Sequence, residues 1–135
     1  MNPLDNPVWH ALTGPQANVA EGDARACRYR PEFSVFSGLP DEPDDAAWDA
    51  LATLSTGPAL LLPPLEPVRG WNPLGTVAVH QMVLDRRPES EMTAARALGA
   101  DDLVELTALV TATEPGPWAE RTHELGRFFG VRVDG

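Results

Sequence analysis

The chain has 135 residues, of which 43% are hydrophobic and 22% are charged, values typical of a soluble globular domain rather than a disordered protein. Its formal net charge is −10, which argues against binding of nucleic acid or anionic lipid through a basic face. The longest apolar run, residues 59–62, is too short to cross a bilayer. A single cysteine and an N-terminus without a basic or apolar stretch predict a cytoplasmic protein without an internal disulfide.

Turn and capping residues delimit short elements in the first part of the chain. Asn6 suits the N-cap of a helix over residues 6–12, and Pro7 suits its first position. Alternating side chains predict a strand over residues 24–30, and a second short strand is expected over residues 33–37. The spacing therefore predicts one helix followed by two strands.

A second helix and a buried strand are expected next. Acidic residues at Asp44 and Asp45 match the positive end of a helix dipole, and Gly57 ends the helix. The apolar run at 59–62 is typical of a buried strand, and the proline-rich residues 63–67 should form an exposed connection.

Residues 76–84 give the strongest strand signal in the sequence. Their length, β-branched content and low polarity predict a strand that is buried on both faces. The polar residues 85–91 are expected to form a linker, and residues 93–98 a further strand. These elements predict an α/β (α+β) fold with a mixed, mostly antiparallel sheet and flanking helices.

Two helices and a final strand are expected in the last part. Apolar residues recur at helical spacing over residues 103–113, with Asp102 and Glu105 spaced as a capping box. A second helix is expected from residue 118 to residue 129. Residues 131–133 read as a strand before a hairpin turn, so we expect the sequence to be the front part of a longer protein. The alternative is a frayed end.

Residues that could carry chemistry are sparse. The three histidines and the single cysteine have no metal-ligand spacing, so no zinc site is expected. Cys27 lies between two arginines, but a small buried cysteine on a strand is the better interpretation than a nucleophile. The paired carboxylates fall at helix starts and in loops, where capping explains them.

The segment between the last two expected helices is the best candidate site. Pro115, Gly116 and Pro117 fix an unusual turn beside Trp118 and several ionisable side chains. Such a rigid connection could form the wall of a ligand site. It could equally be a helix–helix turn whose tryptophan packs on the core.

Four stretches resemble a known superfamily. Residues 95–106, which read ARALGADDLVEL, resemble the opening strand, turn and helix of a GNAT (GCN5-related) N-acetyltransferase domain. The resemblance to the element order of that domain continues with RTHELG at 121–126, in the second helix, and with GVRVDG at 130–135, which enters the next hairpin. Residues 4–15, LDNPVWHALTGP, resemble the N-terminal region of bacterial two-part members described as FR47-like.

The resemblance implies a division of the chain and a chemistry. Residues 1–90 would be the N-terminal α/β region and residues 91–135 the incomplete opening of a GNAT domain. The complete protein would transfer an acetyl group from acetyl-CoA, its co-substrate, to a small-molecule or peptide amine, without nucleic-acid or membrane partners. The resemblance places four residues on the acceptor side: Glu114, Trp118, His123 and Glu124.

The same resemblance limits what this chain can do alone. The glycine-rich turn that holds the CoA pyrophosphate in the family has no match here, so no residue is assigned to CoA and tight binding is not expected. We therefore expect the chain to be inactive by itself. The alternative is a non-catalytic docking domain, and an unpaired strand edge would favour a homodimer.

Overall fold

The computed structural model describes residues 2–66, 68, 70–86 and 94–133. These residues fall into two compact units. Unit 1 comprises Met1–Asn72 and Gly116–Leu125, and unit 2 comprises Pro73–Pro115 and Gly126–Gly135. No helix in the described ranges is both long and apolar enough to cross a membrane.

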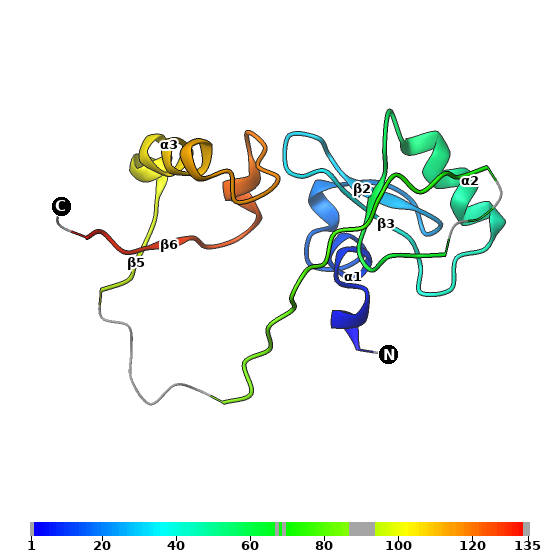
Figure 1. Ribbon diagram of the computed structural model, residues 1–135, viewed down its shortest axis with the longest axis horizontal. Coiled ribbons are helices and arrows are strands. Elements are labelled where there is room, and N and C mark those ends of the chain that lie inside the picture. The colour runs from blue at the N-terminus through cyan, green and yellow to red at the C-terminus, as the bar shows by residue number, and fades with distance from the viewer. Residues whose placement is uncertain (1, 67, 69, 87–93, 134–135) are drawn as a thin grey trace. The chain divides into compact units, whose positions relative to one another are not determined.

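Unit 1 is built on a four-stranded mixed sheet with helices against it (Figure 1). The strand order is β1-β2-β3-β4, with antiparallel pairing from β1 to β3 and parallel pairing of β3 with β4. This confirms the predicted mixed, mostly antiparallel sheet with flanking helices. The elements are η1 (Pro3–Asp5), α1 (Pro7–Leu12), η2 (Ala17–Val19), β1 (Ala20–Gly22), β2 (Cys27–Tyr29), β3 (Phe36–Gly38), α2 (Asp45–Leu54) and β4 (Leu60–Leu61).

The helix starts in unit 1 follow the capping residues. α1 begins at Pro7 after Asn6, as predicted, although the Asn6 amide does not cap it and donates instead to Leu39 O at 2.9 Å. α2 begins at Asp45, and the Asp44 carboxylate accepts a hydrogen bond from the Ala47 N–H at 2.9 Å. The carboxylate satisfies an N–H that the helix leaves without a partner, which confirms this predicted start.

Two apolar clusters form the core of unit 1 because β2 alternates between its faces. Cys27 and Tyr29 are buried with α1, whereas the Arg28 side chain between them lies on the other face of the sheet. The first cluster consists of Val8, Leu12, Val19, Cys27, Tyr29 and Phe33. The second consists of Ala26, Leu39, Ala47, Trp48 and Leu51.

β4 forms where a strand was predicted, but it is not buried. Leu60 is 44% exposed and Leu61 is half-buried. The prediction of a buried strand over 59–62 is wrong because β4 is a two-residue edge strand that pairs only with β3. An apolar run does not distinguish an edge strand from a central one.

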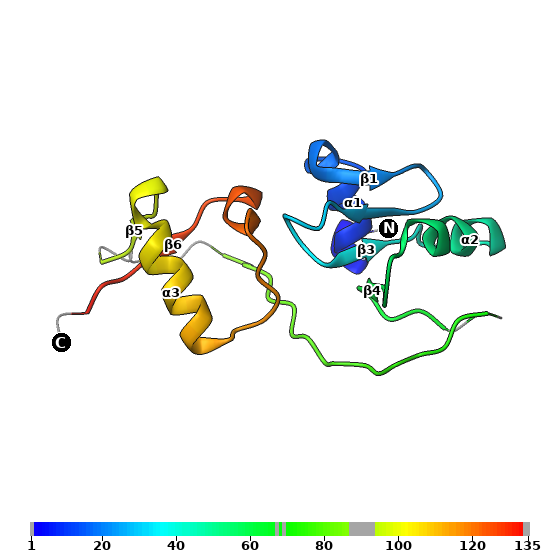
Figure 2. The ribbon, with the colours of Figure 1, turned by 90° about the horizontal axis from the view of Figure 1, so that it is seen from above.

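The described residues of unit 2 form one α-helix and a short strand pair. β5 (Arg96–Ala97) pairs antiparallel with β6 (Phe129–Gly130), and α3 (Leu103–Thr113) lies over this pair (Figure 2). The helix predicted over 103–113 is confirmed. The predicted capping box at Asp102 and Glu105 is wrong, because a 3-10 turn, η3 (Ala100–Asp102), precedes α3 and Asp102 instead accepts from the Gly99 N–H at 2.9 Å.

The strongest predicted strand is absent from the structure. Residues 76–84 form neither helix nor strand and lie as a drawn-out exposed segment (Figure 1). None of the strands in the described part of the chain pairs with them. A strand needs a neighbour to take up its backbone N–H and C=O groups, so propensity alone did not produce one.

The last predicted helix is also wrong. Over residues 118–129 the structure has only the 3-10 turn η4 (Thr122–Leu125), and Phe129 begins β6. Pairing with β5 therefore overrides the apolar spacing that suggested a helix. The strand predicted at 131–133 is not formed, since β6 ends at Gly130. The predicted turn at 134–135 and residues 87–91 of the predicted linker lie outside the described residues.

Candidate functional site

The segment that contains most of the predicted site belongs to unit 1. Hydrogen bonds attach it to residues of that unit that are distant in the sequence. The Arg121 N–H donates to Glu32 O at 2.7 Å, and the Thr122 hydroxyl donates to Phe33 O at 2.7 Å. At its end, the Gln16 side chain donates to Leu125 O at 3.0 Å. These bonds hold residues 119–125 against the loop between β2 and β3.

Phe33 is the centre of this attachment. Its side chain is 1% exposed, with the Arg121 guanidinium carbon 4.4 Å and the Arg30 guanidinium carbon 5.0 Å from the ring centroid. Both distances are within the range of cation–π attraction. Arg121 also forms two bonds to the Glu124 carboxylate, at 2.7 and 2.8 Å. The segment is thus held by an aromatic ring and by an ion pair within itself.

The structure brings three of the four predicted site residues into one unit. Trp118 is half-buried, and His123 and Glu124 belong to η4, with His123 Nε2 4.0 Å from Glu124 Oε1. Glu114 lies in unit 2, where it is the exposed C-cap of α3 with a left-handed φ of 44°. The four residues therefore do not form one cluster within a single unit.

Arg121 sets the charge of this surface. Its hydrogen bond holds the pKa of the Glu124 carboxyl below the ordinary value, and in turn the pKa of the Arg121 guanidinium is raised by Glu124. Glu124 is therefore a carboxylate throughout the neutral range and a weak base. It is therefore unsuited to remove a proton, and the Arg121 guanidinium offsets its negative charge.

We predict that Thr122→Val loosens this segment. The hydroxyl donates to Phe33 O and accepts from the Ala119 N–H at 2.8 Å, so an isosteric valine removes both bonds at a cost of about 1 kcal/mol. Hydrogen exchange at the Arg121 amide should accelerate. Thr53→Val is the control, because the Thr53 hydroxyl bonds only within an exposed helix turn. Equal exchange in both variants would contradict the attachment.

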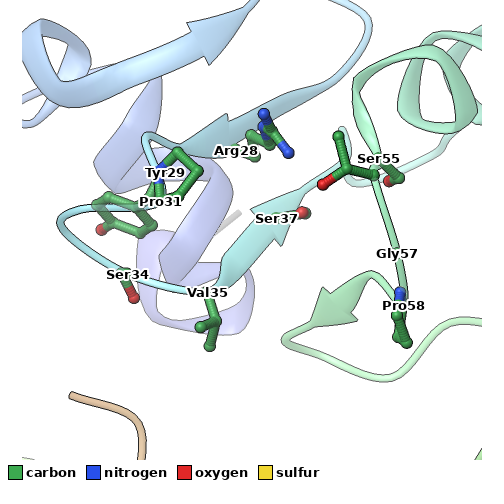
Figure 3. A pocket seen from close by; sticks show the side chains of 10 residues that line it. Arg28, Tyr29, Pro31, Ser34, Val35, Ser37, Ser55, Gly57 and Pro58 are labelled. Carbon is green, nitrogen blue, oxygen red and sulfur yellow. The ribbon is translucent and has the colours of Figure 1, made fainter. Parts of the chain in front are cut away.

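A concave surface lies on the face of the sheet that carries the Arg28 side chain. It is a cavity of about 190 Å³ between β2, β3 and the segment from Ser55 to Pro58 (Figure 3). The strand register places Glu21, Arg28 and Ser37 in one row across β1, β2 and β3. Arg28 and Ser37 point toward the segment from Ser55 to Pro58 (Figure 3).

The cavity is lined by hydroxyl groups and by an arginine whose charge is offset by a neighbouring carboxylate. Arg28 Nε and Nη2 each lie 2.9 Å from Glu21 Oε2, which leaves the other N–H groups of the guanidinium directed elsewhere. Ser37 is 5% exposed, and Ser55 and Thr56 add hydroxyls at the rim. The donors suit a small oxyanion better than a cation, although Glu21 offsets the positive charge.

Cys27 is confirmed as a buried cysteine on a strand, β2. It is 3% exposed, and burial raises the pKa of its thiol to about 11. A reactive cysteine needs the opposite shift, toward the thiolate at neutral pH. Within the described residues, no cluster of three or more histidine, cysteine or carboxylate side chains is arranged to hold a metal ion.

Thiol labelling should report unfolding of unit 1. At pH 8 we expect Cys27 to resist alkylation in the folded chain and to react fully in denaturant. The folded state keeps the thiol proton to about pH 11, whereas the ordinary pKa is 9.0. The stability that protonation of the Cys27 thiol contributes to the folded state is therefore fully present below pH 9.0. It is lost as the pH rises toward 11. Rapid labelling of the folded chain at pH 8 would contradict this burial.

The starts of α2 and α3 do not fit the pyrophosphate of a CoA molecule. Such a group needs free backbone N–H donors at a helix N-terminus without negative side chains. The Asp44 carboxylate occupies the start of α2, and Asp101 and Asp102 lie in the turn that leads into α3. The CoA cradle is therefore not supplied by these elements.

Several residues of the site could not be found from the sequence. Arg30, Glu32 and Phe33 hold the candidate segment, yet Phe33 and Thr122 are separated by 89 positions. Nothing in local spacing predicts that contact. Ser37 was likewise part of an expected strand without a role.

The fold places the chain in a structural class. Its mixed, mostly antiparallel sheet with flanking helices is a GNAT-like fold. In particular, the chain is similar to the crystal structure of a "Putative Acetyltransferase from the GNAT family" from Novosphingobium aromaticivorans DSM 12444, with a TM-score of 0.76 and 38% sequence identity. The match covers 100% of this chain and 61% of that chain. No family model and no curated protein matches the sequence.

Proposed function

We propose that this chain is the front part of a bacterial, FR47-like GNAT acyltransferase that acetylates an amine. The observation that carries the proposal is the 38% identity to the Novosphingobium protein over the whole of this chain. Residues 1–90 would be its N-terminal region and residues 91–135 the opening of its GNAT domain. The protein would be cytoplasmic and would use a small-molecule or peptide amine, without nucleic-acid or membrane partners.

The residues of the candidate segment would line the acceptor side. Trp118 offers an aromatic wall, and the Glu124 carboxylate, kept ionised by Arg121, offers oxygen acceptors for the N–H groups of the amine. His123 lies beside that carboxylate and offers a ring nitrogen for hydrogen bonding. Acetyl-CoA, when bound to the complete protein, supplies the activated acetyl group.

Direct transfer to an amine needs orientation more than a covalent nucleophile. The buried Cys27 thiol is consistent with a mechanism that does not use it. What this chain would contribute is therefore binding and orientation of the acceptor amine.

The first test is turnover by the isolated chain. We predict no transfer from radiolabelled acetyl-CoA to a panel of amines, and no tight CoA binding by calorimetry, because the starts of α2 and α3 carry carboxylates where phosphate should bind. Acetyl transfer by the 135-residue chain alone would contradict the proposal that this chain only binds and orients the acceptor amine.

The second part of the test uses a longer protein that contains this chain. There, Glu124→Gln should raise the KM for the amine by about tenfold, because a charged partner of the cationic substrate is lost. Glu120→Gln is the matched control in the same segment, since Glu120 is exposed. Unchanged KM in both variants would remove Glu124 from the acceptor side.

A non-catalytic docking domain is the second candidate function. It is favoured by the exposed apolar side chains of unit 2, whose described residues include no buried one. Absence of CoA binding by a longer protein would favour this function over the enzyme.

A further inference from the structure

The cavity between β2, β3 and residues 55–58 has no part in the proposed acetyl transfer. Its volume of about 190 Å³ is larger than the roughly 150 Å³ of an engineered protein cavity that binds benzene. Arg28 is the one charged residue among the described residues that line it, so no acidic side chain lines it. In a chain with a net charge of −10, such a lining favours an anion over a cation.

The Arg28 guanidinium has one edge paired and another edge open. Its Nε and Nη2 atoms each lie 2.9 Å from Glu21 Oε2, and within the described residues no acceptor is bound to Nη1. A guanidinium has five N–H groups, of which three remain on Nη1 and Nη2. Two of these point in parallel from the end of the group and match the two oxygens of a carboxylate. Glu21 therefore orients Arg28 and leaves its end edge for a second, planar anion.

Ser37 supplies a buried hydroxyl beside this edge. It lies opposite Arg28 in the pairing of β2 with β3 and is 5% exposed. No hydrogen bond within the described part of the chain engages its hydroxyl, which lines the cavity. A buried hydroxyl without a partner is destabilising, and an acceptor on a ligand would remove that cost. Ser55 and Thr56 add two further hydroxyls at the rim.

The rest of the cavity offers apolar walls. Figure 3 shows Val35 and Pro58 on two sides of the cavity, beyond Ser37 as seen from Arg28. Val35 is 52% exposed, so a ligand there would remove apolar surface from water. The lining thus changes from hydrogen-bond donors near Arg28 to apolar side chains farther along.

We propose that this cavity binds a small monocarboxylate with a short aliphatic chain, of the size of butyrate. The carboxylate pairs with the end edge of Arg28 and accepts from Ser37, while the aliphatic chain packs on Val35 and Pro58. A monoanion fits better than a phosphate dianion, because Glu21 already offsets the charge of Arg28 and no second cation lines the cavity. The inference is independent of acetyl transfer, since binding is measured without CoA.

The test is an NMR titration of the isotope-labelled chain with sodium butyrate, with sodium chloride keeping the ionic strength constant. We expect saturable shifts of the Arg28, Ser37 and Thr56 amides, with a Kd in the millimolar range. Butylamine and inorganic phosphate are the comparison ligands. Each should bind at least tenfold more weakly than butyrate, because the first lacks the carboxylate and the second is a dianion.

Two substitutions should change the affinity in opposite directions. Arg28→Met removes the paired donors and should weaken butyrate binding at least tenfold. Glu21→Gln keeps an oxygen acceptor for Arg28 but removes the neighbouring negative charge, so butyrate should bind about threefold more tightly. Arg25→Met is the matched control, since Arg25 is exposed and does not line the cavity. It should leave the Kd within about twofold of the original value.

Ser37→Ala should weaken butyrate binding about fivefold, because one hydrogen bond is lost. The fluorescence of the buried Trp48 verifies that each variant is folded. The proposal is overturned if the butyrate shifts do not saturate, if Arg28→Met binds as well as Arg25→Met, or if phosphate or butylamine binds more tightly than butyrate. If Arg28→Met does not fold, the sign of the Glu21→Gln effect decides, since weaker binding in that variant would also overturn the proposal.

Discussion

Replacing Gly22 with alanine is expected to destabilise unit 1 by about 2–4 kcal/mol. Gly22 ends β1 with a φ of +114°, a conformation that residues with a side chain rarely adopt. A Cβ atom there would lie 2.2 Å from Ala26 O and 2.9 Å from Leu54 Cδ1. The turn into β2 would have to open, and the Leu54 side chain would have to rotate away from it.

Denaturant unfolding followed by tryptophan fluorescence measures this effect, because Trp48 is 6% exposed in the second cluster. Gly57→Ala is the control, since a Cβ at Gly57 meets no atom within 4 Å. That variant should unfold with a midpoint close to the original or slightly higher. Equal midpoints for the two variants would show that the turn tolerates a side chain.

The difference between the two glycines illustrates what the sequence could predict. Local signals, such as Pro7 at the start of α1 and Asp44 before α2, predicted the helix starts. The Asp44 cap bonds to an N–H only three residues away. The close approach of Ala26 O to Gly22 depends on the pairing of β1 with β2. That pairing is a contact between strands, and β1 had no strand signal of its own.

The largest errors also concern elements that depend on partners. Residues 76–84 have the composition of a strand but no described strand beside them, whereas Phe129 and Gly130 were expected to end a helix and instead pair with β5. In both cases the intrinsic propensity of the residues had less influence on the secondary structure than the presence or absence of a neighbouring strand. The candidate segment was singled out by Trp118 and its prolines and stays a prediction. Its attachment to the loop before β3 could not be predicted, because it joins residues far apart in the chain.

Phe33→Ala is expected to have the largest effect of any single truncation on the candidate site. Phe33 is 1% exposed in the first cluster, so removal of its ring should cost about 3–5 kcal/mol, a large part of the stability of a small domain. The ring also lies beneath Arg30 and Arg121. Without it, both guanidinium groups lose their aromatic partner, and the segment with His123 and Glu124 should detach before unit 1 unfolds.

Two measurements separate these consequences. Denaturant unfolding gives the loss of stability, and hydrogen exchange at the Arg121 amide, which donates to Glu32 O, gives detachment of the segment under native conditions. Phe129→Ala is the matched control, because Phe129 is 58% exposed in unit 2 and its removal should leave both readouts nearly unchanged. If Phe33→Ala left Arg121 exchange as slow as in the control, the candidate segment would be held by its hydrogen bonds alone. Its geometry would then not depend on the core of unit 1.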